Sequence, residues 1–359
     1  MATMMMPKSE QVYEDLREKV RGMRPGSRLP SIRSVMREFG VSQFTVDRAM
    51  ERLAEEGAVV RQASRGVFVT EAAGEGASLR PHVIAIAVPD DFSSPVYTSY
   101  VRSLEEEVAK AGEAARVIRY DCRDRILQGF PEVEIDALII LPTSERLLPE
   151  DFAALSRFSV PTVIFGRVLR DVAIDCVEPD DELGGAMAAE HLMGLGHRRL
   201  AVLVSEPRTV VVELRVQGFC RQARMGGLEE VEVIECGTQM GQRSAIRAYE
   251  TLRGRLKDGV LGFTGLFVVS DMSALGAIKA LEEGGLNVPR DVSVIGFDGI
   301  PEGAVFRPPL TTVAVEIEAV ARLAVEVVAG RFEGSQAAAI HRSVPPKVVV
   351  RESTQGVAS

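Results

Sequence analysis

Several side chains at the start of one predicted helix could read the edges of nucleic-acid bases. The stretch 37–50, REFGVSQFTVDRAM, stops a short amphipathic segment at Gly40 and restarts a helix after Ser42, a residue type that caps helix N-termini. The first turns of that helix then present Gln43, Phe44, Thr45, Asp47 and Arg48. A glutamine amide can bond adenine and an aromatic ring can contact a thymine methyl group, so this pattern suits a helix in the major groove. The alternative is a routine turn between packed helices with polar surface residues.

Motifs for catalysis, cofactor binding and metal binding do not stand out. The segment 237–244, GTQMGQRS, lacks the G-K-[ST] ending of a phosphate loop, and no G-x-G-x-x-G or G-x-S-x-G motif is found in the expected context. His191 and His197 do not have the spacing of a metal pair on a helix face. Four cysteines are scattered without a C-x-x-C pair, which argues against a zinc site or a disulfide framework. We therefore expect a protein that is not an enzyme and uses no cofactor or metal.

Composition and charge place the chain among soluble globular proteins of two or three domains. Its 359 residues are 46% hydrophobic and 26% charged. Residues 1–80 carry 13 Lys/Arg against 11 Asp/Glu, whereas the remainder carries 29 against 40. A mildly basic head on an acidic body suits a nucleic-acid-binding module joined to another domain. No signal-peptide pattern and no apolar run of the ~20 residues that span a bilayer are found, so we expect a cytoplasmic protein without membrane contact.

The elements around the polar helix predict a winged helix-turn-helix. Apolar residues recur every four positions in the first predicted helix, and two short strands joined by a turn follow the third. The predicted helices span 9–24, 31–39 and 43–56, and the predicted strands span 59–62 and 67–70. Three helices followed by a β-hairpin give an α+β DNA-binding domain over 1–70. The small, polar, glycine-bearing segment 71–81 is interpreted as a linker.

From residue 82 the pattern changes to apolar strands that alternate with amphipathic helices. The predicted strands span 83–88, 137–141, 162–165, 200–204, 231–235, 266–269 and 292–297. The predicted helices span 97–111, 181–195, 212–225, 241–257, 272–284 and 316–330. Most of the apolar runs lack polar alternation, as parallel strands buried on both faces do. This alternation predicts a doubly wound α/β fold with two similar lobes over 82–359, in which ligands bind beyond the carboxyl ends of the strands.

The segment PGSRLPSIRSVMREFGVSQFTVDRAMERLAEEGAVVRQASRGVFV resembles the DNA-binding domain of GntR-family regulators over its full length. The LPS helix start, the GVS turn, the T-V-x-x-A-M helix, the L-x-x-E-G exit and the RG wing occur in the family's order. The resemblance implies that Arg33 contacts DNA and that Ser31, Ser42 and Thr45 contact phosphates or bases. It also implies that the wing tip enters the minor groove through Ser64, Arg65 and Gly66.

Two positions depart from the pattern of this family. Many members have arginine where Gln43 and Asp47 stand in this chain. We therefore expect a different operator preference, and we expect Asp47 to orient Arg48 or Arg33.

The second part of the chain resembles the effector domain of LacI/GalR-type repressors, which has the fold of type I periplasmic sugar-binding proteins. AAEHLMGLGHRRLAVL, LRVQGF, VVSDMSALGAIKALEEGGLNVPRDVSVIGFD and PPLTTV carry the likeness. The combination with a GntR-type head is the arrangement of the arabinose-repressor-like branch. By this resemblance the effector site contains Asp91, Phe92, Arg167, Arg215, Ser270 and Asp298. Asp298 closes a buried strand, where a carboxylate is costly without partners, and Arg215 offers a fork of donors. A purely structural Arg–Asp pair remains the alternative.

The sequence thus predicts a ligand-responsive, sequence-specific DNA-binding regulator. We expect a repressor of sugar or small-metabolite genes, a homodimer on a pseudo-palindromic operator, whose affinity for DNA changes when a sugar-like effector binds between the lobes. The alternative is a cytoplasmic small-molecule binding protein, or a two-lobed enzyme, whose head serves protein contacts.

Overall fold

The chain divides into two compact units, residues 1–81 and 82–359. The computed structural model describes residues 8–62, 66–70, 81–89, 95–120, 134–142, 155, 160–166, 173–239, 241–259, 261–333, 335 and 338–357. Within these ranges, no helix is both long and apolar enough to cross a membrane.

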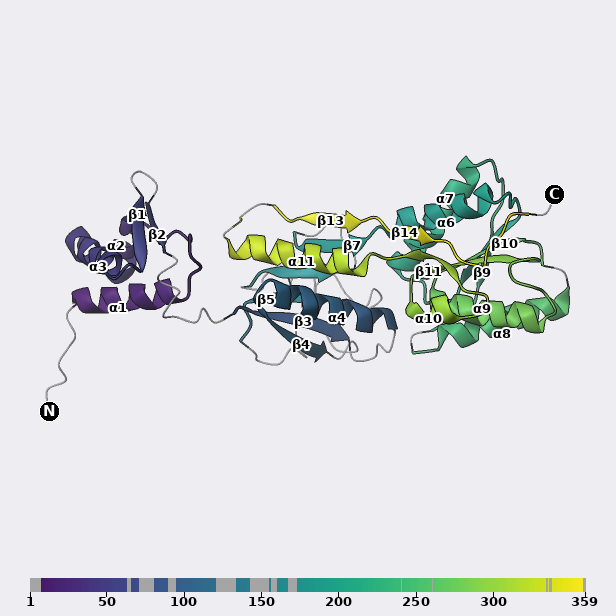
Figure 1. Cartoon of the computed structure of the whole chain (residues 1–359), viewed down its shortest axis with the longest axis horizontal. Helices are drawn as coiled ribbons and strands as arrows, with labels where there is room; N and C mark the ends of the chain where they lie inside the picture. Colours follow the sequence, from purple (N-terminus) through teal and green to yellow (C-terminus); the bar gives the residue numbers. More distant parts are fainter. Residues whose placement is uncertain are drawn as a thin grey trace. The chain divides into compact units, whose positions relative to one another are not determined.

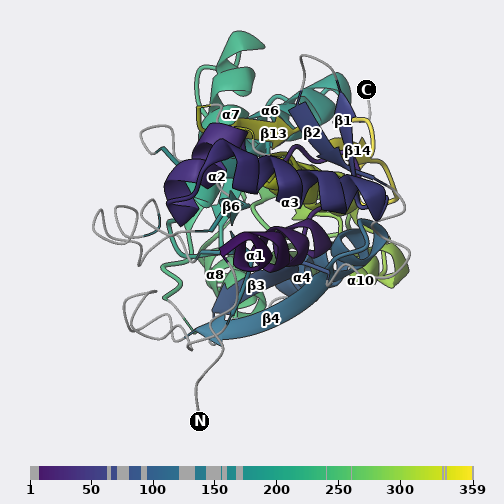
Figure 2. The ribbon, with the colours of Figure 1, turned by 90° about the vertical axis from the view of Figure 1, so that its left-hand side faces the viewer.

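The first unit is a three-helix bundle followed by a β-hairpin, as the sequence predicted. It contains α1 (Lys8–Arg21), α2 (Ile32–Phe39), α3 (Gln43–Glu55), β1 (Val59–Gln62) and β2 (Gly66–Val69). Helix α1 packs along α3, and the antiparallel hairpin lies beside α3 (Figure 2). The core consists of apolar side chains that recur at helical spacing, among them Val12, Leu16, Val35, Val46, Met50 and Leu53. The predicted winged helix-turn-helix is confirmed.

A capped turn separates α2 from α3. Gly40 ends α2 with a left-handed backbone, φ 60°, a conformation that costs glycine little because it has no Cβ. Two residues later the Ser42 hydroxyl accepts the backbone N–H of Thr45 at 3.4 Å and so begins α3. At the start of α2 the Ser31 hydroxyl accepts the N–H of Ser34 at 3.2 Å. These local signals fix where α3 begins and which side chains occupy its first turns.

The second unit contains two six-stranded sheets, each with helices packed against it (Figure 1). The first lobe has β3 (Val83–Pro89), β4 (Ala114–Tyr120), β5 (Ala137–Ile140), β6 (Thr162–Phe165), β7 (Asp175–Pro179) and β13 (His341–Val344), in the order β13-β7-β6-β5-β3-β4. The second lobe has β8 (Leu200–Val204), β9 (Glu232–Glu235), β10 (Gly265–Val268), β11 (Ser293–Asp298), β12 (Thr311–Ala314) and β14 (Lys347–Val349), in the order β14-β12-β11-β10-β8-β9. The described pairings in these sheets are parallel except β12–β14. The predicted two-lobed α/β architecture is confirmed.

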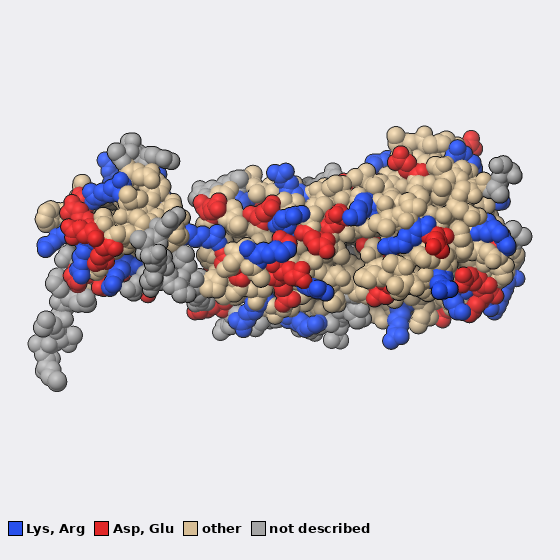
Figure 3. Space-filling view, in the orientation of Figure 1, with Lys and Arg blue, Asp and Glu red and all other residues tan. Residues whose placement is uncertain are grey.

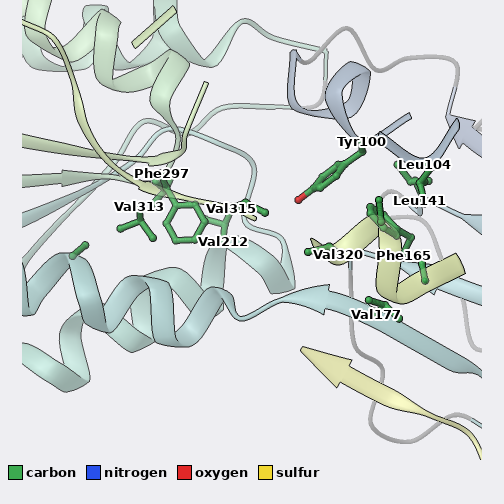
Figure 4. Packing of buried hydrophobic residues seen from close by; sticks show 14 of the residues in the cluster. Tyr100, Leu104, Leu141, Phe165, Val177, Val212, Phe297, Val313, Val315 and Val320 are labelled. Atoms are coloured by element: carbon green, nitrogen blue, oxygen red, sulfur yellow. The ribbon is translucent and has the colours of Figure 1, made fainter. Parts of the chain in front are cut away.

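The helices of the second unit connect these strands. They are α4 (Pro95–Lys110), α6 (Asp181–Gly194), α7 (Val210–Met225), α8 (Ser244–Asp258), α9 (Asp271–Glu283), α10 (Pro301–Val305) and α11 (Ile317–Phe332). The chain passes between the lobes after β7, after β12 and again after β13, so α11 packs on the first lobe although it follows strands of the second. One buried apolar cluster accordingly contains side chains from both lobes (Figure 4).

Strands without a continuous apolar run escaped the sequence pattern. Strand β4 is an edge strand that exposes Arg116, Val117 and Arg119. Strand β7 begins with buried Asp175, whose carboxylate accepts two hydrogen bonds from Arg331 of α11, at 2.8 and 2.7 Å. Because Arg331 lies far away in the sequence, nothing local indicates that Asp175 is buried, and the sequence did not predict this strand. The short strands β12, β13 and β14 were also missed, because three or four residues with polar members among them form no continuous apolar run.

Helices α6 and α7 approach each other so closely that their backbones touch. A Cβ on Gly185 would lie 2.0 Å from the Arg215 carbonyl oxygen, and a Cβ on Gly218 would lie 1.9 Å from the Glu182 carbonyl oxygen. Only glycine fits at these positions. The crossing places the N-terminal end of α6 against the middle of α7, and it therefore sets the distance between Asp181 and Arg215.

We expect Gly218→Ala to lower the free energy of unfolding by about 3 kcal/mol, because the methyl group would collide with a backbone carbonyl that cannot move alone. Gly194→Ala, at the exposed end of α6 with nothing within 4 Å, is the matched control. It should stay within about 1 kcal/mol of wild type, on the stabilising side. Urea unfolding of the full chain measures both. Equal effects of the two substitutions would refute the close-crossing argument.

Candidate functional site

The start of α3 presents the predicted DNA-reading side chains on one exposed surface. Gln43 and Arg48 are exposed, and Phe44 is 75% exposed although it is a large apolar side chain. Burying such a ring against a partner would remove apolar surface from water, so Phe44 is available for contact with a partner. Thr45 is half-buried, and its hydroxyl lies 3.0 Å from that of Ser42. The structure thus brings these four residues together.

Asp47 differs from its expected role. Its carboxylate accepts a hydrogen bond from Arg61 of β1, at 3.1 Å, rather than from Arg48 or Arg33. Sequence reasoning missed Arg61, because hairpin pairing and the packing of β1 on α3 decide which arginine reaches the acid. Arg33 is exposed on α2, and Ser31 caps that helix. The expected wing-tip residues Ser64 and Arg65 lie outside the described residues, whereas Gly66 begins β2 with φ 121°.

In the second lobe a buried arginine bridges two aspartates. Arg215 of α7 donates through Nε to Asp181 of α6 at 2.7 Å and through Nη1 to Asp298 at 3.1 Å. The same Nη1 donates to the Val269 carbonyl oxygen at 2.7 Å, and the guanidinium lies 3.7 Å from the centre of the Phe297 ring. The predicted pair is therefore a triad within one lobe. Asp181 was missed because two acids after a strand are typical of a helix start, and Asp180 is the one that caps α6.

Asp298 is held in an unusual backbone conformation at the end of β11. Its φ is 115°, a region that non-glycine residues seldom occupy. Neighbouring Gly299 and Ile300 donate their backbone N–H groups to buried Asp271 at 2.8 and 2.9 Å. A second oxygen of Asp271 accepts the Thr312 hydroxyl at 2.6 Å. Asp271 thus fixes the loop after Asp298, and that loop keeps the Asp298 carboxylate beside Arg215.

Burial dominates the electrostatics of this group. It raises the pKa of Asp298 to about 8, and the nearby carboxylates of Asp271 and Glu206 add to the rise, while the Arg215 guanidinium opposes it. Burial also raises the pKa of Asp271 to about 6, against the hydrogen bonds that the carboxylate accepts. Acids outnumber the single cation here, and the raised pKa moves the Asp298 carboxyl toward its protonated form.

Further polar groups extend the site toward the first lobe. Ser270 donates its hydroxyl proton to Glu206 at 2.8 Å, and its hydroxyl oxygen lies 3.0 Å from that of Ser273. Tyr100 of α4 points its hydroxyl toward Val212, Phe297 and Val315 of the second lobe (Figure 4). Burial raises the pKa of Tyr100, and the carboxylates of Asp181 and Asp298 raise it further. Sequence reasoning missed Tyr100, because this residue belongs to an amphipathic helix pattern that indicates only core packing.

The predicted first-lobe residues Asp91, Phe92 and Arg167 lie outside the described residues. In the part of the chain that the structure covers, no group of three or more His, Cys, Asp or Glu side chains is arranged to hold a metal ion.

Family models match most of the first unit and part of the second. Residues 8–69 match the family model for bacterial regulatory proteins of the gntR family, and residues 189–354 match a periplasmic binding protein-like domain. The HTH-type transcriptional regulator DegA of Bacillus subtilis (strain 168) is 28% identical over 338 residues, which cover 90% of this chain and 98% of DegA. The HTH-type transcriptional regulator reg1 of Streptomyces lividans is 27% identical, covering 88% of this chain and 94% of reg1.

A solved structure shares the fold of the second unit. It is the periplasmic binding protein/LacI transcriptional regulator from Alkaliphilus metalliredigens QYMF complexed with D-xylulofuranose. The match has a TM-score of 0.63 and 25% identity, and it covers 76% of this chain and 99% of that chain.

We expect Arg215→Ala to lower the free energy of unfolding by about 3–5 kcal/mol, because it leaves two buried carboxylates without their cation. Arg208→Ala is the matched control. Arg208 pairs with Glu213 and Glu235 next to the start of α7, but this arginine is exposed. The control should cost under about 1 kcal/mol. Denaturant titration of each full-length variant gives the values, and a small effect of Arg215→Ala would show that the triad does not hold the fold.

Proposed function

Because the chain is a helix-turn-helix transcriptional regulator with a gntR-family DNA-binding domain and a periplasmic binding protein-like domain, we propose that it is a sugar-responsive repressor. It acts in the cytoplasm on genes for the uptake or catabolism of a sugar or related metabolite. The observation that carries this proposal is the exposed surface at the start of α3, where Gln43, Phe44 and Arg48 follow a capped turn.

In the proposed complex α3 lies in the major groove of operator DNA. Gln43 and Phe44 read base edges there, and Arg48 and Arg33 contact bases or phosphates. Ser31, Ser42 and Thr45 add contacts to the DNA backbone, and the wing tip with Ser64, Arg65 and Gly66 enters the minor groove. Sequence preference then depends mainly on Gln43 and Phe44, whereas the phosphate contacts set overall affinity.

The proposed effector lies between the lobes, against Arg215, Ser270 and Asp298 of the second lobe and Tyr100 of the first. By the family resemblance, Asp91, Phe92 and Arg167 are expected to contribute to the same site. Sugar hydroxyls both donate and accept hydrogen bonds, and these residues offer acceptors, donors and an aromatic hydroxyl. The sugar held by the Alkaliphilus relative supports this class of ligand. An effector that binds one arrangement of the lobes better than another shifts the balance between states of different DNA affinity.

We expect the full-length chain to enrich a short sequence from a randomised duplex DNA pool and to bind it with an affinity that falls steeply with salt. Arg33→Ala should weaken that binding by about 1–3 kcal/mol if the side chain reads a base, and less if it meets only phosphate. A panel of pentoses and hexoses should contain one that changes the affinity. Fluorescence anisotropy over a salt series, with the enriched duplex as probe, measures the salt dependence, the effect of Arg33→Ala and the effect of each sugar. If no sequence is enriched, the head serves protein contacts and the repressor proposal is wrong.

We further propose that the repressor is a homodimer on a pseudo-palindromic operator. One winged helix offers few contacts, and two half-sites roughly add their binding energies. On the second lobe, Val305 at the end of α10 is 83% exposed, and Met272 on the adjacent helix α9 is 36% exposed. On the face of the molecule in Figure 3, acidic and basic side chains are interspersed rather than gathered by sign. These exposed apolar side chains on α9 and α10 make this region the proposed surface for self-association.

Val305→Asp should shift the protein toward monomer, because a charge in an apolar interface loses water without gaining a partner. Met225→Asp, at a 76% exposed apolar residue on α7, is the matched control and should leave the oligomer unchanged. Sedimentation velocity at micromolar concentration distinguishes the species. A wild-type protein that sediments as a monomer, or equal effects of the two substitutions, would exclude this surface.

A further inference from the structure

An ion pair joins α3 to the β-hairpin of the DNA-binding unit. Arg61 of β1 donates through Nη2 to Oδ1 of Asp47 at 3.1 Å. We propose that Arg61 contacts operator DNA and that Asp47 is the positioning residue that holds it, so that helix and hairpin read DNA as one unit. The inference deepens the proposed repressor function and rests on it.

The geometry leaves most of the Arg61 guanidinium available. Among the described residues, Asp47 is its only hydrogen-bonding partner, and only one of its terminal nitrogens is engaged. The side chains of Arg61 and Asp47 are 44% and 29% exposed, so neither is enclosed by protein. A guanidinium has five N–H donors, and a fork of two matches a phosphate or the O6 and N7 atoms of guanine. Arg61 can therefore keep Asp47 and still bind DNA.

The position of Arg61 in the hairpin places its guanidinium on the side of the unit that is proposed to face DNA. Arg61 pairs in register with Val67, and the next pair, Gln62 with Gly66, is the last before the hairpin end. Val59, two residues earlier, is buried in the core. The strand thus begins in the core and ends beside α3, where Asp47 lies one helical turn beyond Gln43 and Phe44.

Charge explains why the pair matters for binding. Asp47 is the sole acid between Gln43 and Met50, in the part of α3 that presents Phe44 and Arg48. An unpaired carboxylate there would repel the phosphate backbone. Pairing with Arg61 cancels that charge and at the same time fixes a donor group on the surface. An exposed ion pair contributes little to folding, so its value lies in the position of the guanidinium.

For Asp47→Asn the proposal predicts a change in DNA affinity opposite in direction to the one that a simple charge argument predicts. Removing a negative charge from a DNA-facing surface by itself strengthens DNA binding. If Asp47 holds Arg61, however, Asp47→Asn should weaken binding to the selected sequence in the wild-type background. In the Arg61→Ala background the same substitution should strengthen binding, because the acid then has no cation to hold.

The experiment is a double-mutant cycle on the full-length protein. The probe is the duplex that the wild-type chain enriches from a randomised pool, and affinity is measured by fluorescence anisotropy over a salt series. Arg61→Ala should weaken binding by about tenfold and lower the slope of log affinity against log salt by about 1 if the contact is to phosphate. The affinity of Arg61→Lys should lie between those of the wild type and Arg61→Ala, since lysine keeps the charge but not the two-donor fork of arginine. Arg17→Ala, at a partly exposed arginine paired with Glu14 on α1, is the control and should change neither quantity. Unchanged thermal midpoints show that the variants are folded.

Other outcomes overturn the proposal. If Asp47→Asn strengthens binding in both backgrounds, the carboxylate is only an obstacle to DNA. If it weakens binding in both and removes a preference for cytosine at one position, Asp47 itself reads the base. If Arg61→Ala behaves like Arg17→Ala, the ion pair has no role in DNA binding. A chain that enriches no sequence removes the interface, and the proposed repressor function fails with it; enrichment with a null Arg61→Ala result refutes this inference alone.

Discussion

A single buried guanidinium organises the second lobe. Arg215 connects Asp181 on α6, Asp298 at the end of β11 and the Val269 carbonyl at the end of β10. Taking these charges out of water is costly, and only their mutual contacts offset that cost. The arrangement therefore requires α6 and α7 to approach to backbone contact, which the glycines at their crossing allow. The site and the packing of the lobe thus depend on the same interaction.

This dependence bears on how an effector could act. Asp298 sits in a strained backbone conformation that Asp271 and the loop after β11 maintain. A ligand group that hydrogen-bonds Asp298 would also favour one protonation state of this carboxyl, whose pKa burial raises to about 8. Tyr100 reaches the same region from the other lobe. Ligand contacts, proton binding and the relative position of the lobes are then linked through a few side chains.

The DNA-binding unit is built on a different principle. Its helix ends are set by local caps at Ser31, Gly40 and Ser42, and its core consists of apolar side chains and Tyr13, whose hydroxyl donates to Glu56. Charged groups remain at the surface and are joined in exposed pairs such as Asp47 with Arg61. Such pairs are weak contributors to stability, so they can be redirected toward DNA without loss of the fold. Stability is thus separated from recognition here, whereas the two coincide in the second lobe.

The sequence by itself determined the order of the elements, the capped turn before α3 and the apolar strands of both lobes. Those features depend on residues close together in the chain, through caps, helical spacing and continuous apolar runs. Tertiary structure decided which charges meet: Asp181 with Arg215, Asp47 with Arg61 and Asp175 with Arg331. It also decided the polar and edge strands that had no apolar run. An ion pair leaves no local pattern, because its partners are chosen by the packing of distant elements and one arginine is chemically like another until the fold brings it to its acid.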